Sequence, residues 1–361
     1  LYAGAGRSSA PFSQWRQTEV SLLVDWNEHA CQTYKHNHPK APYVVADLAN
    51  TTAKQIQTWA GGKLDIVLGC PPCQGFSESG KRDKKDPRND HVITFVNHAV
   101  QLKPSVIAME NVPLAGTSEQ FKKATKILER NGYSWTADIL NAALYGSTQA
   151  RRRLVMIAVG NNLKIDPALP IPAHLPLGQY FDYGRQELRL FEEVSADLLD
   201  MPVQESLLGG KVFSTGKFAL TPTVYDIIDG LPAMGRADAR RLGHLAWSHG
   251  PEILKAMESV KEGGQRKGSK KKYYGAAYAR LHRKGLARTI TTYFPNAGSG
   301  RFWHPTQNRA LTLREAARIQ GFPDSFHFLE GATAANATLV GNALDARLAN
   351  ATYMAVRRIL D

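Results

Sequence analysis

The sequence predicts an α/β fold, with a Rossmann-like domain on a mostly parallel sheet and a second, smaller domain. Over the first ~160 residues, short apolar runs alternate with helical patterns, as they do in βαβ units. From about residue 161 to 290, proline, glycine and charged residues dominate and the periodicity is weak, which indicates a separate unit. A chain of 361 residues is long enough to bury two cores.

The predicted elements follow one another in the order that βαβ units require. Buried strands are expected at 65–69, 105–109 and 153–160, and helices at 91–102 and 118–131. Gly132 stands at the C-terminal cap position of the second helix. Near the end of the chain, Thr312 and Glu315 have the spacing of a capping box, and the helix that they open is expected to end at 321–323.

The composition is that of a basic globular protein. The chain has 45 Lys and Arg against 32 Asp and Glu, a net charge of +13, and this excess favours a polyanionic partner. Residues 261–288 hold ten Lys and Arg against one acid, and 81–88 form a second basic run.

No apolar run is long enough to cross a membrane, and three cysteines cannot form a disulfide framework, so we expect a protein of the reducing cytoplasm. No signal-peptide pattern opens the chain, and its first residues read as the tail of a strand, so further residues are expected upstream.

A cysteine lies in a polar turn directly after the strand expected at 65–69. The turn reads Pro-Pro-Cys-Gln-Gly-Phe-Ser over residues 71–77, and open α/β sheets place their active sites at this end of a strand. Cys73 is therefore a candidate thiolate nucleophile, with a buried structural cysteine as the alternative. The prolines argue against a redox role for the C-x-x-C pair of Cys70 and Cys73. A zinc site is not expected, because no second ligand pair with finger spacing accompanies His29, Cys31, His36 and His38.

Charged side chains follow or precede neighbouring strands at the same expected edge of the sheet. Glu110 comes directly after the second strand and is a candidate general acid, with a solvated loop residue as the alternative. Three consecutive arginines precede the third strand, and strand alternation sends Arg151 and Arg153 to one side. Surface charge is the ordinary explanation for such a run, but here it flanks the edge that carries Cys73.

A glycine turn and two acids mark the expected ends of the first strands. Gly4 and Gly6 form a turn after an apolar start, although any tight turn uses such a pair. Asp25 follows the next apolar run at a spacing that suits a ribose hydroxyl, and Asp47 ends a third run. Trp26 is able to stack on an adenine. Together these positions indicate a cofactor with a ribose and an adenine.

Taken together, the motifs resemble those of the DNA cytosine-5 methyltransferases, the bacterial and phage type in particular. The resemblance rests on motifs in the family's order at 71–77, 110–112, 149–153, 280–292, 304–305, 311–323 and 341–343. It implies a Rossmann-like, S-adenosylmethionine-dependent methyltransferase domain with a smaller target-recognition domain. The catalytic domain is expected at 1–164 and 325–361, and the target-recognition domain with its hinge at 165–324.

The resemblance implies methyl transfer from S-adenosylmethionine to carbon 5 of cytosine in double-stranded DNA, with base flipping and without a metal. Cys73 matches the nucleophile that adds to carbon 6 of the ring. Glu110 matches the group that protonates ring nitrogen 3. Arg151 matches the arginine that holds the carbonyl oxygen of cytosine, and Arg153 supports the pocket.

The resemblance also implies positions for the cofactor and the DNA. The residues matched to the S-adenosylmethionine site are Tyr2, Gly4, Gly6, Asp25, Trp26, Asp47, Leu48, Pro72 and Asn342. The polar, basic segment 74–90 is expected to close over DNA. The residues expected to contact DNA are Gln74, Ser77, Lys81, Arg82, Lys270, Lys271 and Lys272. We expect a cytoplasmic monomer of a restriction–modification system, without membrane association.

Alternative functions stay open at this point. An enzyme of the same fold can act on RNA, and a direct comparison of DNA and RNA substrates distinguishes the two. A non-catalytic DNA-binding pseudoenzyme is the second alternative, against which the intact Cys73, Glu110 and Arg151 argue. A plain NAD-dependent Rossmann enzyme is not expected to carry the Pro-Pro-Cys-Gln motif.

Two departures from the family's pattern lie near the expected cofactor site. Arg7 stands where the family has the second of two glycines after Ala5. Leu344, Asp345 and Ala346 stand where a valine and prolines are usual. Arg7 is expected either to point to solvent or to pair with the carboxylate of the cofactor through its guanidinium.

Overall fold

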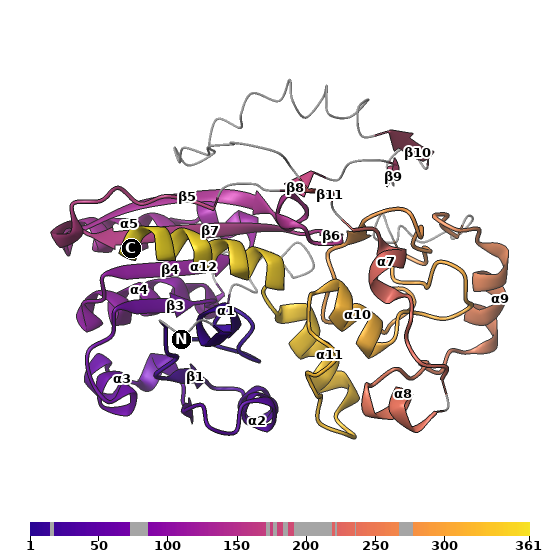
Figure 1. The fold of residues 1–361 in the computed structure, drawn as a ribbon, viewed down its shortest axis with the longest axis horizontal. Coiled ribbons are helices and arrows are strands. Elements are labelled where there is room, and N and C mark those ends of the chain that lie inside the picture. Colours follow the sequence, from indigo (N-terminus) through magenta and orange to yellow (C-terminus); the bar gives the residue numbers. More distant parts are fainter. Residues whose placement is uncertain are drawn as a thin grey trace.

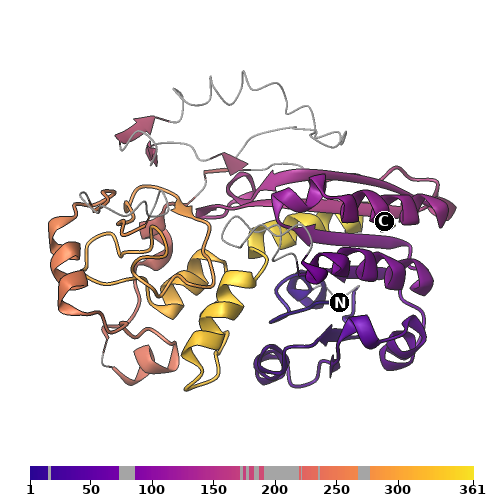
Figure 2. The same cartoon turned by 180° about the vertical axis from the view of Figure 1, so that it is seen from behind.

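The chain folds into two lobes that lie side by side (Figure 1). The computed structural model describes residues 1–14, 18–72, 86–170, 174–175, 179–182, 187–190, 219–220, 222–234, 236–266 and 277–361. The first lobe contains a sheet and the helices that pack on it, and the second lobe is formed mainly by the chain after residue 222 (Figure 1). The last helix, α12 (Ala346–Leu360), returns to the first lobe (Figure 2). Within the described residues, no helix has the length and apolar character of a membrane span. The same residues contain no cluster of three or more His, Cys, Asp or Glu that could hold a metal ion.

A four-stranded sheet forms the centre of the first lobe. Its strands in spatial order are β3 (Ile66–Gly69), β4 (Val106–Asn111), β7 (Arg152–Gly160) and β5 (Tyr133–Asn141). β3 and β4 are parallel, and β7 runs antiparallel to both of its neighbours, so β5 has the direction of β4. β1 (Leu23–Asp25) and β2 (Tyr43–Val45) form a further parallel pair. Residues 1–3 join the two sheets, because Leu1 N donates to Leu68 O at 2.7 Å and Ala3 N donates to Val24 O at 3.1 Å. The predicted α/β fold with mostly parallel strands is confirmed.

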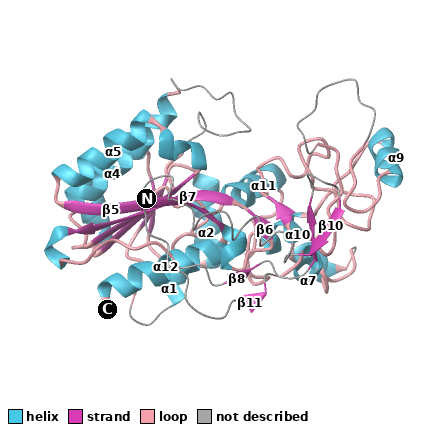
Figure 3. Cartoon of the chain, turned by 90° about the horizontal axis from the view of Figure 1, so that it is seen from above, coloured by secondary structure: helices cyan, strands magenta, loops and turns pink. Residues whose placement is uncertain are grey.

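Helices cover both faces of the four-stranded sheet (Figure 3). One face carries α3 (Ala53–Ala60), α4 (His91–Leu102) and α5 (Glu119–Arg130), and the other carries α1 (Ala10–Gln14) and α12. Alternation along β4 serves both cores, because Ile107 and Met109 pack with α4 and α5 while Val106 and Ala108 pack with α12. α2 (Glu28–Asn37) lies against the β1–β2 pair.

The elements predicted for this lobe are confirmed, with small differences at their ends. α4 spans the predicted 91–102, and α5 begins after Ser118, whose side chain caps it. Gly132 follows α5 with a φ of 77°, the left-handed conformation that a glycine cap adopts. β4 is longer than predicted, because its last two residues, Glu110 and Asn111, pair with β7. Glu110 therefore ends a strand instead of following one.

The second lobe is built from short helices and connecting segments. Its helices are α7 (Val224–Ile228), α8 (Ala237–Arg241), α9 (Pro251–Ser259), α10 (Leu313–Ile319) and α11 (Thr333–Asn342). The capping box predicted at Thr312 and Glu315 is present at the start of α10.

Short strands and 3₁₀ helices complete the fold. The short strands are β6 (Gln149–Ala150), β8 (His174–Leu175), β9 (Gln179–Asp182), β10 (Glu187–Leu190), β11 (Ala219–Leu220) and β12 (Ala287–Arg288). The 3₁₀ helices are η1 (Leu48–Asn50), η3 (Pro87–Asp90), η4 (Pro113–Thr117), η5 (Ala142–Tyr145) and η6 (Asn161–Leu163). β12 pairs in parallel with β6, which joins the second lobe to the segment that leads into β7.

A second hydrophobic core fills the second lobe and includes Ala5 and Ala30 of the first lobe at its edge. Its buried residues include Val224, Leu281, Phe294, Ile319 and Phe326. Val340 of α11 belongs to this core, whereas Leu344 and Leu348 pack with the residues of β4 and β7 in the first lobe. By its packing, the chain therefore passes back to the first lobe between residues 340 and 344, whereas the sequence places this boundary at 325.

Candidate active site

Glu110 and Arg153 form an ion pair at the carboxyl end of β4. Because β7 runs antiparallel to β4, the first residues of β7 lie beside the last residues of β4. Arg153 Nε lies 2.8 Å from Glu110 Oε1, and each side chain is 12% exposed. The structure thus brings together two of the residues that were predicted for catalysis, and it leaves both with a small accessible surface.

Asn111 connects the cysteine turn to this strand. Its Nδ2 donates to Pro71 O at 3.2 Å, and its Oδ1 accepts from Val112 N at 2.8 Å. The side chain is buried, so both hydrogen bonds are sheltered from water. Cys73 lies outside the described residues, but the turn that carries it begins at this contact. No role for Asn111 was predicted from the sequence, although its place directly after Glu110 in the motif points to it.

Arg151 is fully buried, and its guanidinium holds backbone carbonyls of the chain that returns from the second lobe. Nη1 donates to Ile290 O at 3.0 Å, and Nη2 donates to Gly341 O at 3.1 Å and to Ala343 O at 3.0 Å. Burial lowers the pKa of Arg151 to about 9, and the positive charge of Arg153 acts in the same direction. The donors that were expected to hold a cytosine carbonyl are directed at peptide carbonyls in this structure.

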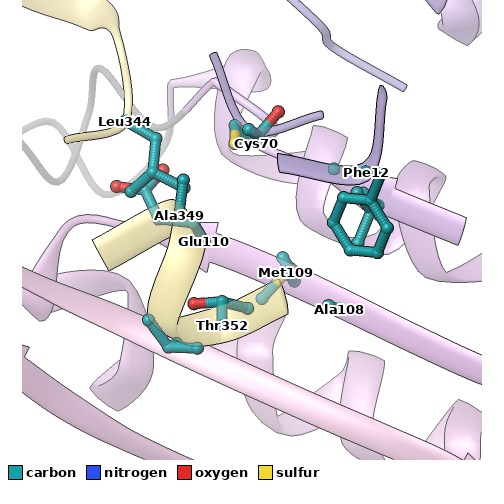
Figure 4. Close-up of a pocket in the computed structure, with 12 residues that line it drawn as sticks. Phe12, Cys70, Ala108, Met109, Glu110, Leu344, Ala349 and Thr352 are labelled. Atoms are coloured by element: carbon teal, nitrogen blue, oxygen red, sulfur yellow. The ribbon is translucent and has the colours of Figure 1, made fainter. Parts of the chain in front are cut away.

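A small cavity lies on the α12 face of the sheet, beside Glu110 (Figure 4). Its volume is about 20 Å³, and its lining includes Cys70, Glu110, Leu344 and Thr352. This is room for one water molecule and not for a base. Burial raises the pKa of the Cys70 thiol, and the Glu110 carboxylate raises it further, so Cys70 stays protonated at neutral pH. Cys70 therefore has neither the space nor the thiolate that a nucleophile for cytosine needs.

A tight glycine turn follows the first three residues. Tyr2, Gly4 and Gly6 have positive φ values of 53°, 52° and 74°. Gly4 N donates to Asp25 Oδ2 at 2.8 Å and Asn27 N donates to Asp25 Oδ1 at 2.8 Å, so one carboxylate holds the turn at the end of β1. A Cβ on Gly4 would meet no atom within 4 Å, which leaves open space beside the turn.

Three residues predicted for the cofactor lie at the ends of neighbouring strands. Asp25 ends β1, and its register partner in β2 is Val45, two residues before Asp47. Trp26 is 70% exposed, so the face of its ring is available to a ligand. The two carboxylates and the indole therefore share the edge of the sheet that carries the glycine turn.

The other residues predicted for the cofactor are placed differently. The side chains of Tyr2 and Leu48 are buried, and the Tyr2 hydroxyl lies 2.9 Å from His91 Nδ1. Pro72 is the last described residue before the cysteine turn, and Asn342 is exposed at the end of α11. His91 is a neighbour of Tyr2 that the sequence did not indicate.

Comparison with known proteins identifies the family. The family model described as C-5 cytosine-specific DNA methylase matches residues 1–358. The chain belongs to this family. The activity predicted from the motifs, methylation of cytosine at carbon 5 in DNA, is thereby confirmed, and a plain NAD-dependent enzyme is excluded.

Relatives of this methylase are similar to it over most of their length. The Type II methyltransferase M1.HphI of Haemophilus parahaemolyticus is 30% identical over 372 residues, which cover 99% of this chain and 86% of the relative. The Type II methylase M.HgiDII of Herpetosiphon aurantiacus is 26% identical, with 93% of this chain and 88% of the relative covered. A solved structure described as a DNA modification methyltransferase encoded within an E. coli prophage has a TM-score of 0.70 at 22% identity, covering 100% of this chain and 98% of that chain. This last likeness supports the fold.

The basic run of the methylase is attached to a paired stretch of the second lobe. Gln265 and Ala279 form an antiparallel bridge, and Arg266 N donates to Tyr278 O at 3.0 Å. Buried Arg301 donates to two carbonyl groups just before Gln265 and so supports the same stretch. The residues predicted for DNA contact lie outside the described residues, namely Gln74, Ser77, Lys81, Arg82, Lys270, Lys271 and Lys272.

Proposed function

We propose that this methylase transfers the methyl group of S-adenosylmethionine to a cytosine held beside Glu110 and Arg153 at the carboxyl end of β4. The observation that carries the proposal is the 2.8 Å ion pair between these residues, next to the turn that leads to Cys73. An acid, a guanidinium and a thiol at one edge of the sheet are the groups that activation of a cytosine ring requires.

Carbon 5 of cytosine is a weak nucleophile until a group adds to carbon 6. The Cys73 thiolate forms a bond to carbon 6 and Glu110 protonates ring nitrogen 3, so the displaced electron pair makes carbon 5 part of an electron-rich enamine. S-adenosylmethionine supplies an electrophilic methyl group on its sulfonium sulfur. Once carbon 5 is methylated, nitrogen 3 returns its proton to Glu110. A water molecule then takes the proton of carbon 5 while Cys73 departs from carbon 6 with the bonding pair, which restores the ring and the thiolate.

Arg153 is the guanidinium best placed to hold the carbonyl oxygen of the cytosine. It lies beside Glu110, whereas Arg151, to which the resemblance assigned this role, directs its donors to three peptide carbonyls. We assign Arg151 a positioning role, in which it holds the start of β7 against the chain that returns from the second lobe.

The glycine turn and the strand ends beside it offer the groups that S-adenosylmethionine needs. The open space at Gly4 lets backbone N–H groups approach a ligand without hindrance from a side chain. The exposed Trp26 ring suits the adenine, and the carboxylates of Asp25 and Asp47 suit the ribose hydroxyls. Asp25 retains acceptor capacity for this role, because each carboxylate oxygen has a second lone pair. These residues fit the cofactor.

Double-stranded DNA is the proposed substrate, with the target cytosine rotated out of the helix. A base stacked within a duplex cannot bring carbon 6 to a thiolate, so flipping is required. The net charge of +13 and the basic run at 261–288 favour contacts with phosphates. The names of the Type II relatives support a role in restriction–modification. The proposal also includes target recognition by the domain at 165–324 and action as a cytoplasmic monomer.

Methyl transfer to plasmid DNA, followed by base-resolution sequencing, tests the proposal. Wild type should place 5-methylcytosine at one recurring sequence, and Cys73→Ser should place none, because a hydroxyl is far less nucleophilic than a thiolate. A duplex with 5-fluorocytosine at that sequence should form a covalent complex with wild type, since fluorine cannot leave as a proton. Cys70→Ser is the matched control and should still be trapped. Transfer to RNA but not to DNA, or trapping by Cys73→Ser, would overturn the proposal.

A further inference from the structure

Arg7 extends from the glycine turn of the first lobe to the second lobe. Its Nη2 donates to Gly321 O at 2.9 Å, and its Cζ lies 4.9 Å from the centre of the Phe322 ring. Burial lowers the pKa of Arg7 to about 10, which agrees with a guanidinium that is largely withdrawn from water. The expectation that this side chain points to solvent is therefore wrong.

The second departure from the family's pattern lies at the same junction. Asp345 is fully buried and accepts hydrogen bonds from Ser147 Oγ and from Gln149 Nε2, the latter at 3.0 Å. Its negative charge attracts the Arg7 guanidinium, while the neighbouring Arg347 repels it. A cation in place of a glycine and a carboxylate in place of a proline thus lie at the same junction of the lobes, and the carboxylate attracts the cation without a direct hydrogen bond in the described contacts.

The glycine turn has mostly local hydrogen bonds apart from this contact. Gly4 N donates to Asp25, and Gly6 N donates to Ala3 O at 2.9 Å, so both bonds stay within the first lobe. Gly6 packs so closely on α2 that a Cβ there would lie 2.1 Å from the Tyr34 ring. The hydrogen bond and the ring contact of Arg7 therefore connect the far end of the turn to the second lobe.

We propose that Arg7 is a positioning residue for the cofactor, which holds the glycine turn in place by docking on Gly321 and Phe322. The inference rests on the proposed S-adenosylmethionine site. It is the alternative to direct pairing of Arg7 with the carboxylate of the cofactor. Nη2 and the flat face of the guanidinium are engaged by the second lobe, and the buried Nε has no hydrogen-bond partner among the described residues. It follows that affinity for the cofactor depends on Phe322, a residue of the second core.

Calorimetric titration with S-adenosylhomocysteine measures this dependence without turnover. Arg7→Gly removes the hydrogen bond and the ring contact and should weaken binding about tenfold, as expected for one charge-assisted hydrogen bond. Arg7→Lys keeps the charge but not the planar face, so it should recover only part of the affinity. Arg236→Ala removes an exposed arginine of the second lobe and is the matched control, which should bind like wild type. In steady-state assays, Arg7→Gly should raise KM for S-adenosylmethionine and leave kcat nearly unchanged.

A double-mutant cycle separates positioning from direct contact. Phe322→Leu should weaken binding of S-adenosylhomocysteine as well, and combining it with Arg7→Gly should add little, because both changes remove one contact. Direct pairing with the carboxylate predicts that Phe322→Leu has no effect or that the two losses multiply. Either result overturns the proposal, as does equal or tighter binding by Arg7→Gly. If Phe322→Leu does not fold, Phe322→Met, which keeps most of the volume but not the ring, takes its place in the cycle. Failure of wild type to bind S-adenosylhomocysteine refutes the cofactor assignment instead.

Discussion

At the scale of single residues, Arg151 and Arg153 have neighbouring positions and different partners. Arg151 lies between β6 and β7, and Arg153 is the second residue of β7. Arg151 is buried and donates to three peptide carbonyls, whereas Arg153 pairs with Glu110 and keeps some access to solvent. Removal of each guanidinium should therefore affect a different property of the enzyme.

Arg153→Ala should lower kcat by at least about tenfold, because Glu110 loses its partner and the cytosine loses a donor. Its free energy of unfolding should fall by about 1 to 3 kcal/mol, because Glu110 loses its partner at a position where its side chain is only 12% exposed. Arg151→Ala leaves three carbonyls without donors and opens a cavity, so it should cost about 3 to 5 kcal/mol. Urea unfolding together with single-turnover kinetics distinguishes the two. Similar stability losses in both variants would show that Arg151 is not the structural member of the pair.

At the scale of elements, α11 approaches the segment before Phe294 more closely than any side chain would allow. A Cβ built on Gly341 would lie 2.3 Å from Thr292 N. Gly341→Ala should therefore force the two segments apart and destabilise the protein by about 1 to 3 kcal/mol. It should also disturb the start of β7, because Gly341 O accepts from Arg151.

Gly250→Ala provides the control for this prediction. Gly250 precedes α9, and a Cβ there would meet no atom within 4 Å. Its substitution should cost less than about 1 kcal/mol, the loss that a changed helix cap produces. Urea denaturation curves compare the two variants, and a Gly341→Ala protein as stable as wild type would mean that α11 moves without penalty.

The basic run at 261–288, within which Gln265 and Ala279 are joined by a bridge, is the second element with a testable role. Reversal of charge at Lys270, Lys271 and Lys272 should weaken binding to all DNA sequences and flatten its dependence on salt, because each phosphate contact releases counterions. The matched control reverses three exposed lysines of α5, Lys122, Lys123 and Lys126, which should leave the salt slope nearly unchanged. Fluorescence anisotropy at several salt concentrations measures the DNA affinity of both variants and its salt dependence. If wild type and the variant reversed at 270–272 had equal salt slopes, these lysines would not contact phosphates.

At the scale of the whole molecule, the second lobe contains a buried charged network that makes stability depend on pH. Arg309 pairs with both oxygens of Glu315 at 2.7 Å, and His304 lies beside them. Burial lowers the pKa of His304 from 6.5 to about 4. Its Nδ1 accepts from Gln307 N at 3.0 Å, a hydrogen bond that protonation would break.

The protein should therefore lose stability in acid. Between pH 6.5 and about 4, the unfolded chain binds a proton at His304 that the native protein does not bind, so stability falls as pH falls through this window, by up to about 3 kcal/mol. Burial lowers the pKa values of His244, His249 and His282 as well, and they act in the same direction. Urea unfolding at neutral pH and near pH 5 tests this, with His304→Asn expected to flatten the profile. A wild-type stability that is constant over this range would contradict the account.

The contact between the lobes also belongs to this scale. Asn37 of α2 exchanges two hydrogen bonds of 2.7 Å with the backbone of His327, and His29 Nε2 lies 2.9 Å from Asn336 Oδ1. Together with Arg7 and Asp345, these polar contacts join the cofactor side of the first lobe to the second lobe. The position of the glycine turn therefore depends on how the two lobes pack against each other.

The sequence by itself determined the features that depend on near neighbours and on side-chain chemistry. The bounds of α4, the glycine cap at Gly132 and the capping box at Thr312 follow from residues a few positions apart, where periodicity and capping act. The order of the motifs along the chain was sufficient to identify the family. The reaction followed from the residue types in those motifs, because methylation of a cytosine ring requires a thiol, an acid and a guanidinium. It also pointed to Glu110 and Arg153, which the structure brings together.

Only the tertiary structure decided which group each of these side chains contacts. The antiparallel course of β7 places Glu110 within a strand and beside Arg153. Arg151 donates to a carbonyl 139 residues further along the chain, and Arg7 to one 314 residues away. No local pattern encodes such pairs, because the energy of a buried guanidinium depends on whichever carbonyls the packed lobes bring within reach.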